Sequence, residues 1–230
     1  MSSSLSPSRA RRHAHVWLVA FLVAVAFATP VGAAAPSSTA PAPAAADLDQ
    51  TGNPGDPIRL NHELAPGDEA RLAWVTPDGS RAVYAAPPDA FYSVAADGGT
   101  PVRLTPDLPP DGYYWGTGVS PDSGYFLFIA DVDGRAHELY AVPIDGGEPR
   151  QISSGTPRYG VVENFLFTND METVVYWVDE TGDREMALYS VPFSGGTPTK
   201  LVPADEVLDY FGYVTLTPDT DTVFFECASI

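Results

Sequence analysis

The stretch AHELYAVPIDGG, residues 136–147, decides the fold because the chain repeats it. It returns as MALYSVPFSGG at residues 186–196 and in weaker form as AFYSVAADGG at residues 90–99. Each copy places a Leu-Tyr or Phe-Tyr pair shortly before a Gly-Gly pair, which is typical of a β-strand that enters a hairpin turn. The sequence is therefore predicted to be a repeat protein.

A second motif fixes the length of the repeat. Four turn sequences, TPDG, SPDS, TNDM and TPDT, begin at Thr76, Ser120, Thr168 and Thr217, which are 44, 48 and 49 residues apart. This spacing is that of β-propeller blades, and no 3.6-residue helical pattern accompanies it. An apolar, β-branched and aromatic run of strand type follows each turn; these runs span residues 81–86, 125–130, 173–178 and 222–227.

Four short strands make up each repeat. The strand before the turn, the strand after it, the Leu-Tyr strand and a short segment after Gly-Gly give antiparallel blades at about residues 70–105, 113–153 and 160–202. The fourth repeat, residues 210–228, has only its first two strands, because the Leu-Tyr and Gly-Gly elements do not follow. The sequence therefore predicts an all-β fold, with blades of four antiparallel strands in an incomplete or open propeller arc.

The combined pattern resembles a known repeat family. Ser/Thr-Pro-Asp-Gly, an apolar strand, and then Glu-Leu-Tyr-x-Val-Pro-x-Asp-Gly-Gly are similar to the WD40-like Pro-Asp propeller repeat of TolB and its relatives. Related blades occur in the propellers of prolyl-oligopeptidase-type serine peptidases. The resemblance covers about residues 57–230 and implies a partner platform, a ligand binder or an enzyme gate.

The segment PIRLN at residues 57–61 resembles PVRLT at residues 101–105, the outermost strand of a blade. In a complete ring it would join the last blade and close the circle, but the fourth repeat lacks the strand that would bridge to it. Unpaired strand edges favour association with another chain, so self-association through open edges is an expectation.

The N-terminus has the features of a secretory leader. Arg9, Arg11 and Arg12 precede an apolar run at residues 16–27, and small residues before Ala33 suit cleavage there, giving a signal peptide at residues 1–33. An uncleaved membrane anchor and a twin-arginine signal remain alternatives. Residues 34–56 are mostly Ala, Pro, Ser and Thr and predict a disordered linker, so the mature protein is expected to be secreted or periplasmic.

Charge and cysteine content limit the partners. The chain has 12 Lys and Arg against 30 Asp and Glu residues, and removing the leader brings the net charge from −18 to about −21. A surface this acidic excludes nucleic acid as an expected partner and favours a cationic partner, a bound cation or simple solubility. Cys227 is the only cysteine, so no disulfide forms within the chain.

The turn residues have a structural explanation that competes with any chemical one. The carboxylates of Asp78, Asp122, Asp170 and Asp219 are expected to accept backbone N–H groups within their turns. The Gly-Gly pairs are expected to supply the positive φ of a hairpin, and no helix follows them to form a phosphate site. These glycines are Gly98, Gly99, Gly146, Gly147, Gly195 and Gly196.

The sequence contains few candidate motifs for catalysis or metal binding. There is no Gly-x-Ser-x-Gly elbow, and neither His62 nor His137 stands in His-Glu-x-x-His, so no catalytic residue and no cofactor is assigned. Asp131, Asp133 and Glu138 are weak candidates for a cation site, but an EF-hand register would put its end ligands on Ile129 and Tyr140. A solvated hairpin tip is the alternative for this loop and for the similarly acidic residues 179–183.

Aromatic residues precede the first strands of the second and fourth repeats. Tyr113, Trp115, Tyr210 and Phe211 would approach a central channel, where they would either pack between blades, the favoured interpretation, or hold a peptide or saccharide. The sequence thus predicts an exported, non-catalytic platform for protein interaction or ligand binding. The alternatives are a propeller fragment of a larger prolyl-oligopeptidase-like hydrolase or a lyase, and a non-functional truncation product.

Overall fold

The computed structural model describes residues 22–24, 59–110, 112–154, 156, 160–168, 170–182, 185–202, 210–217 and 222–228. Apart from Leu22–Ala24, the predicted leader and the predicted linker lie outside the described residues. None of the described residues is helical, so no helix among them is long and apolar enough to cross a membrane.

Three four-stranded antiparallel sheets form the bulk of the fold, and each runs in chain order. Blade 1 contains β2 (Arg71–Val75), β3 (Arg81–Ala86), β4 (Ala90–Ala95) and β5 (Val102–Arg103). Blade 2 contains β6 (Tyr114–Val119), β7 (Tyr125–Ala130), β8 (Glu138–Pro143) and β9 (Arg150–Gln151). Blade 3 contains β10 (Val161–Phe167), β11 (Thr173–Asp179), β12 (Met186–Pro192) and β13 (Thr199–Lys200). The predicted all-β blade of four antiparallel strands is confirmed.

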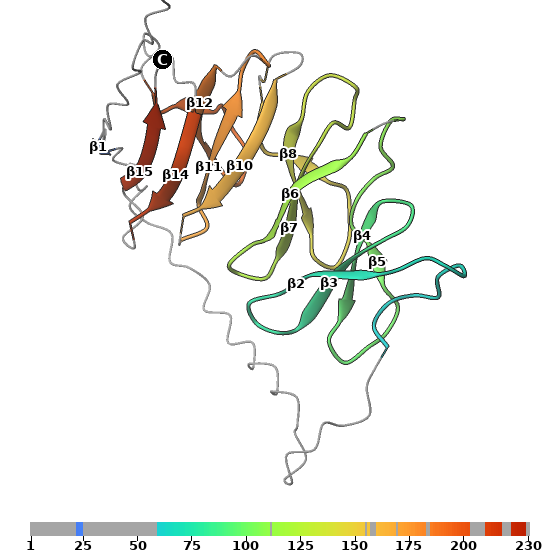
Figure 1. Ribbon diagram of the computed structural model, residues 1–230. Coiled ribbons are helices and arrows are strands. Elements are labelled where there is room, and N and C mark those ends of the chain that lie inside the picture. The colour runs from blue at the N-terminus through green and yellow to red at the C-terminus, as the bar shows by residue number, and fades with distance from the viewer. Residues whose placement is uncertain are drawn as a thin grey trace, which may run out of the picture.

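A fourth sheet ends the arc. It contains β14 (Tyr210–Leu216) and β15 (Thr222–Ala228), and β1 (Leu22–Ala24) pairs with the other edge of β15. Figure 1 shows the sheets following one another along an open arc, with blade 1 and the fourth sheet at opposite ends. The predicted open arrangement is confirmed. The predicted cleavage after Ala33 would remove β1.

The hairpin before the second strand of each blade is held by the side chains of its turn. In blade 2, Asp122 Oδ1 accepts the Ser120 hydroxyl (2.6 Å) and the backbone N–H of Gly124 (2.9 Å), and Ser120 Oγ accepts the N–H of Tyr125 (2.8 Å). Thr168 and Asp170 repeat this arrangement in blade 3. Asp219 lies outside the described residues.

The same turn in blade 1 affects the acidity of its aspartate. Hydrogen bonds from the Thr76 side chain and from the Ser80 backbone lower the pKa of Asp78 to about 2. Across the blade boundary, the N–H of Asp78 donates to Ser123 Oγ in the turn of blade 2 (3.1 Å). The turns therefore help to fix one blade against the next.

The core lies between the blades. On β7, Phe126 and Phe128 face blade 1, where Val83 and Leu104 meet them. Leu127 and Ile129, the alternate residues, face blade 3 and join a separate buried cluster. Because successive side chains of a strand point to opposite faces, burial on both faces requires the continuous apolar run that β7 has.

The outer face of blade 1 is covered by the chain itself. Leu60, Leu64 and Ala70 pack over a buried cluster that includes Tyr84 and Val94. His62 adds a hydrogen bond between its Nδ1 and the Tyr84 hydroxyl (2.8 Å). Residues 59–61, part of the segment that resembles an outermost strand, are not in a strand here; they belong to this covering segment.

Candidate functional site

The strand that precedes the turn motif in each sheet, β2, β6, β10 or β14, lies at a sheet edge and contains a β-bulge. In β2 the bulge falls between Leu72 and Trp74, and in β6 between Trp115 and Thr117. A bulge bends the strand and redirects its side chains. The neighbouring strands β2 and β6 carry large apolar side chains that face solvent.

Three of these side chains, together with Tyr113, which directly precedes β6, are among the exposed large apolar residues of the described chain. Leu72 is 67% exposed, Tyr113 50%, Trp74 41% and Trp115 37%. We call Leu72, Trp74, Tyr113 and Trp115 the aromatic surface. Large apolar residues that remain in contact with water are a feature of interaction sites when they are neighbours.

Each indole of the aromatic surface is anchored to the following blade. Trp74 Nε1 donates to Thr117 Oγ1 of blade 2 (3.0 Å), and Trp115 Nε1 donates to the backbone oxygen of Glu163 in blade 3 (3.1 Å). These bonds hold the rings in place while part of each ring stays exposed. The two bonds thus cross two blade boundaries, from blade 1 to blade 2 and from blade 2 to blade 3.

The structure brings Tyr113 and Trp115 together, with ring centroids 6.2 Å apart, and places Tyr113 5.3 Å from the ring of His137. Packing between blades is instead provided by Tyr114, which meets Phe91 and Phe128 edge-on. Tyr210 and Phe211, the other two predicted residues, lie on β14, and blade 3 stands between β14 and β6. Their side chains fall outside the described part of the chain.

Leu72 and Trp74 are members of the surface that the sequence analysis missed. They occupy the run RLAWV immediately before the TPDG turn, which is the position that β6 occupies before its own turn. Aligning the first strands on the turn would have found them.

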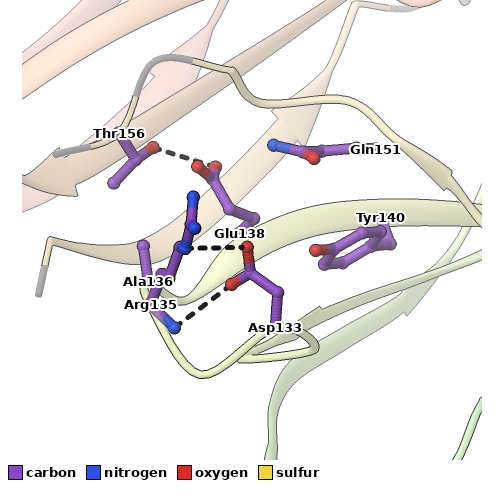
Figure 2. Close-up of a pocket in the computed structure, with 7 residues that line it drawn as sticks. All are labelled: Asp133, Arg135, Ala136, Glu138, Tyr140, Gln151 and Thr156. Atoms are coloured by element: carbon purple, nitrogen blue, oxygen red, sulfur yellow. Dashed lines mark hydrogen bonds and ion pairs between the residues drawn. The ribbon is translucent and has the colours of Figure 1, made fainter. Parts of the chain in front are cut away.

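The acidic loop of blade 2 borders a partly open cavity of about 350 Å³. Figure 2 shows Asp133, Arg135, Glu138, Tyr140 and Gln151 around it, with Thr156 bonded to Glu138. Asp131 is the third residue predicted as a possible cation ligand. Its Oδ1 accepts hydrogen bonds within the loop from the backbone N–H groups of Gly134 (2.6 Å) and Arg135 (3.0 Å). Across the described residues, no three His, Cys, Asp or Glu side chains are close enough to hold a metal ion.

Glu138 is the buried acid of this cavity, at 8% exposure. Its Oε2 accepts hydrogen bonds from Ser153 Oγ and from Thr156 Oγ1 (2.9 Å). Burial raises the pKa of Glu138 in spite of these hydroxyls, and the charge of Asp133 adds to the increase. Burial and the nearby charge of Glu138 also raise the pKa of Tyr140, to about 12, so its hydroxyl stays protonated at neutral pH.

The residues that complete the cavity, Gln151 and Thr156, were not predicted either. The available signal was spacing, because Gln151 follows Tyr140 by the same eleven residues that separate Arg103 from Tyr92 and Lys200 from Tyr189.

Comparison with known proteins finds distant likenesses among solved structures alone. No protein-family model matches the chain, and no curated protein matches it. Among solved structures, a putative TolB from Agrobacterium tumefaciens is 22% identical with a TM-score of 0.48, covering 66% of this chain and 52% of that one. TolB from Acinetobacter baumannii is 14% identical with a TM-score of 0.45, covering 66% and 42%.

The tricorn protease matches with a TM-score of 0.50 and 11% identity, over 68% of this chain and 15% of its own. The chain therefore spans about half the length of the TolB structures and a small part of the protease. At identities of 11–22%, these likenesses transfer no activity to the chain.

Proposed function

We propose that the protein is an exported, non-catalytic platform that binds another protein, or a peptide of it, on the aromatic surface. The observation that carries this proposal is that Trp74 and Trp115 are exposed and yet fixed in position by hydrogen bonds to the next blade. A side chain held in this way loses little further entropy when a partner covers it.

The composition of the surface suits protein recognition. Tryptophan and tyrosine dominate the energetics of protein interfaces, because each buries a large area with few rotatable bonds. Tyr113 adds apolar area beside Trp115, since their ring centroids are 6.2 Å apart, and Leu72 is a further exposed apolar side chain of β2. A saccharide, which also stacks on aromatic rings, is the alternative ligand of the same surface.

The charge of the chain favours a basic partner. With 30 acidic and 12 basic residues, the protein attracts cations over distances longer than a contact. Electrostatic attraction of this kind accelerates encounter and weakens with salt. We expect the partner to carry basic residues around the apolar area that contacts the aromatic surface.

A larger enzyme is the second candidate. The match to the tricorn protease covers only 15% of that protein, so an arc of this kind can form a small part of a hydrolase. Reading the coding sequence on both sides of the chain tests this candidate, because a contiguous hydrolase or lyase domain would assign the arc to an enzyme.

Capture of partners from the envelope and the medium of the source organism tests the platform. The bait is the mature protein, and the variants are Trp74→Ala, Trp115→Ala and, as a matched control, Tyr213→Ala, an exposed aromatic on the fourth sheet. We expect the two tryptophan variants to weaken binding of the captured partner by about tenfold or more, as hot-spot residues do. The control should bind like the wild type.

Thermal unfolding of the same variants separates binding from folding. Trp115→Ala removes one hydrogen bond and a partly buried ring, so a loss of about 1–2 kcal/mol is expected. Unchanged binding in both tryptophan variants, or equal loss in Tyr213→Ala, would contradict the assignment of the surface.

A further inference from the structure

The fourth sheet contains a strand from a distant part of the sequence. β14 lies on one side of β15, and β1 lies on the other side, antiparallel to β15. In blades 1–3 that side of the second strand is occupied by the third strand, β4, β8 or β12, which is also antiparallel. β1 therefore holds the place of a third strand.

The register of β1 is also that of a third strand. In blades 1–3, the residue six positions after the first residue of the turn motif pairs with a valine of the third strand. These pairs are Ala82 with Val94, Phe126 with Val142, and Val174 with Val191. In the fourth sheet the residue at this position is Val223, and its partner on β1 is Val23. A slip of one residue would place Leu22 or Ala24 opposite Val223, so the shared valine depends on the register.

The valine of the third strand is a core residue in all three blades. Val94, Val142 and Val191 are each 0% exposed, and each belongs to a buried cluster of its blade. Val223, the partner of Val23 in the fourth sheet, is itself buried in the cluster that joins this sheet to blade 3. The position that Val23 occupies along the sheet is thus one where the repeat requires an apolar β-branched residue.

The sequence around Val23 also follows the pattern of the third strand. The three blades have YSVA at residues 92–95, YAVP at residues 140–143 and YSVP at residues 189–192. The predicted leader has FLVA at residues 21–24, with an aromatic residue two positions before the valine and an alanine after it, as in blade 1. Leu22 departs from the pattern, because the blades have Ser or Ala there.

We propose that the edge of β15 is a strand-acceptor site, and that in the precursor its occupant is the FLVA segment of the predicted leader. A segment that adds to a sheet edge gains backbone hydrogen bonds, and its alternate side chains select the register. The leader then has a role in the folded precursor as a temporary third strand, which ends with the predicted cleavage after Ala33. This site lies on the fourth sheet, so it goes beyond the proposed function and does not depend on the aromatic surface.

Disulfide cross-linking of the full-length precursor tests the register. The chain is synthesised in a cell-free system without membranes, so that the leader stays attached, and in a Cys227→Ser background. Val23→Cys is combined with Val223→Cys, because residues directly opposite in antiparallel strands have Cα atoms about 4.5–5.5 Å apart, within the range of a disulfide. We expect mild oxidation to cross-link this pair at least about tenfold faster than two control pairs, as a change of mobility in electrophoresis without reductant.

Each control pair moves one of the two cysteines. Val23→Cys with Phe224→Cys uses the next residue of β15, whose side chain points to the opposite face. Val19→Cys with Val223→Cys tests WLVA at residues 17–20, the other quartet of the leader that matches the pattern. Equal rates for the three pairs would show that the leader has no fixed register on β15, and failure of the Val23 and Val223 pair to cross-link would show that it does not dock there. Either result overturns the proposal.

Amide hydrogen exchange of the full-length precursor leaves β15 unaltered and keeps the test valid even where Val223→Cys disturbs the fold. Val23→Pro interrupts the paired segment, since proline lacks a backbone N–H, and Val16→Pro places the same residue in the apolar run outside FLVA. We expect Val23→Pro to accelerate exchange of the β15 amides by about tenfold or more, and Val16→Pro to leave it within about twofold. Equal acceleration by both prolines, or none by Val23→Pro, would contradict the strand-acceptor site.

Discussion

At the scale of single residues, Gly146 has a role that its place in a hairpin does not reveal. Its φ is 100°, and a Cβ built on it would lie 2.5 Å from Cγ1 of Val102 on the outermost strand of blade 1. Gly195, the equivalent residue of blade 3, has a φ of 103°, but its Cβ would meet only Nη1 of Arg150, at 3.9 Å. Both positions therefore require a positive φ, but only Gly146 also lacks room for a Cβ atom.

We therefore predict unequal effects of the same substitution. Gly195→Ala should lower the free energy of unfolding by about 1–2 kcal/mol, the cost of a positive φ at alanine. Gly146→Ala should add about 1–3 kcal/mol to that cost, because it also forces blade 1 and blade 2 apart. Urea unfolding measures both, and Val102→Ala in the Gly146→Ala background should recover part of the added cost. Equal losses in the two single variants would contradict the close approach.

At the scale of the element, β7 shows what distinguishes a propeller blade from a sheet that covers a single core. Phe128 and Ile129 are adjacent, point to opposite faces and are both fully buried, one against blade 1 and one against blade 3. In a sheet with one solvated face, one of two such neighbours would be exposed.

This arrangement predicts that both neighbours stabilise the fold. Phe128→Ala should cost about 3–5 kcal/mol and Ile129→Ala about 2–5 kcal/mol in urea unfolding, since each leaves a cavity between blades. Tyr213→Ala, at an exposed position, should stay within about 0.5 kcal/mol of the wild type. A negligible effect of either β7 substitution would show that blades do not pack on both of its faces.

The strands could be predicted from the sequence, but the packing and exposure of their side chains could not. Turn spacing and the Leu-Tyr and Gly-Gly pairs predicted antiparallel four-stranded blades, because turn chemistry and strand composition are local properties. A continuous apolar run such as β7 does not reveal which side chain faces which blade, since both faces are buried. The exposure of Trp74 and the pairing of Gln151 with Tyr140 depend on bulges and register between strands, which local composition does not specify.

At the scale of the whole molecule, the arc is open, with blade 1 at one end and the fourth sheet at the other (Figure 1). The outer face of blade 1 is covered by Leu60, Leu64 and Ala70 rather than by another blade. An open arc leaves the aromatic surface of blades 1 and 2 accessible to a partner larger than a ring channel would admit. The proposed binding of a partner on the aromatic surface relies on this openness.

Distances between spin labels test this openness most directly. Labels are placed on cysteines at the first residues of β3, β11 and β15 (Arg81→Cys, Thr173→Cys and Thr222→Cys), two at a time, in a Cys227→Ser background. The open arc predicts that the distance from blade 1 to the fourth sheet exceeds the distance from blade 1 to blade 3. A shorter distance from blade 1 to the fourth sheet would place them as neighbours in a closed ring and contradict the open arc.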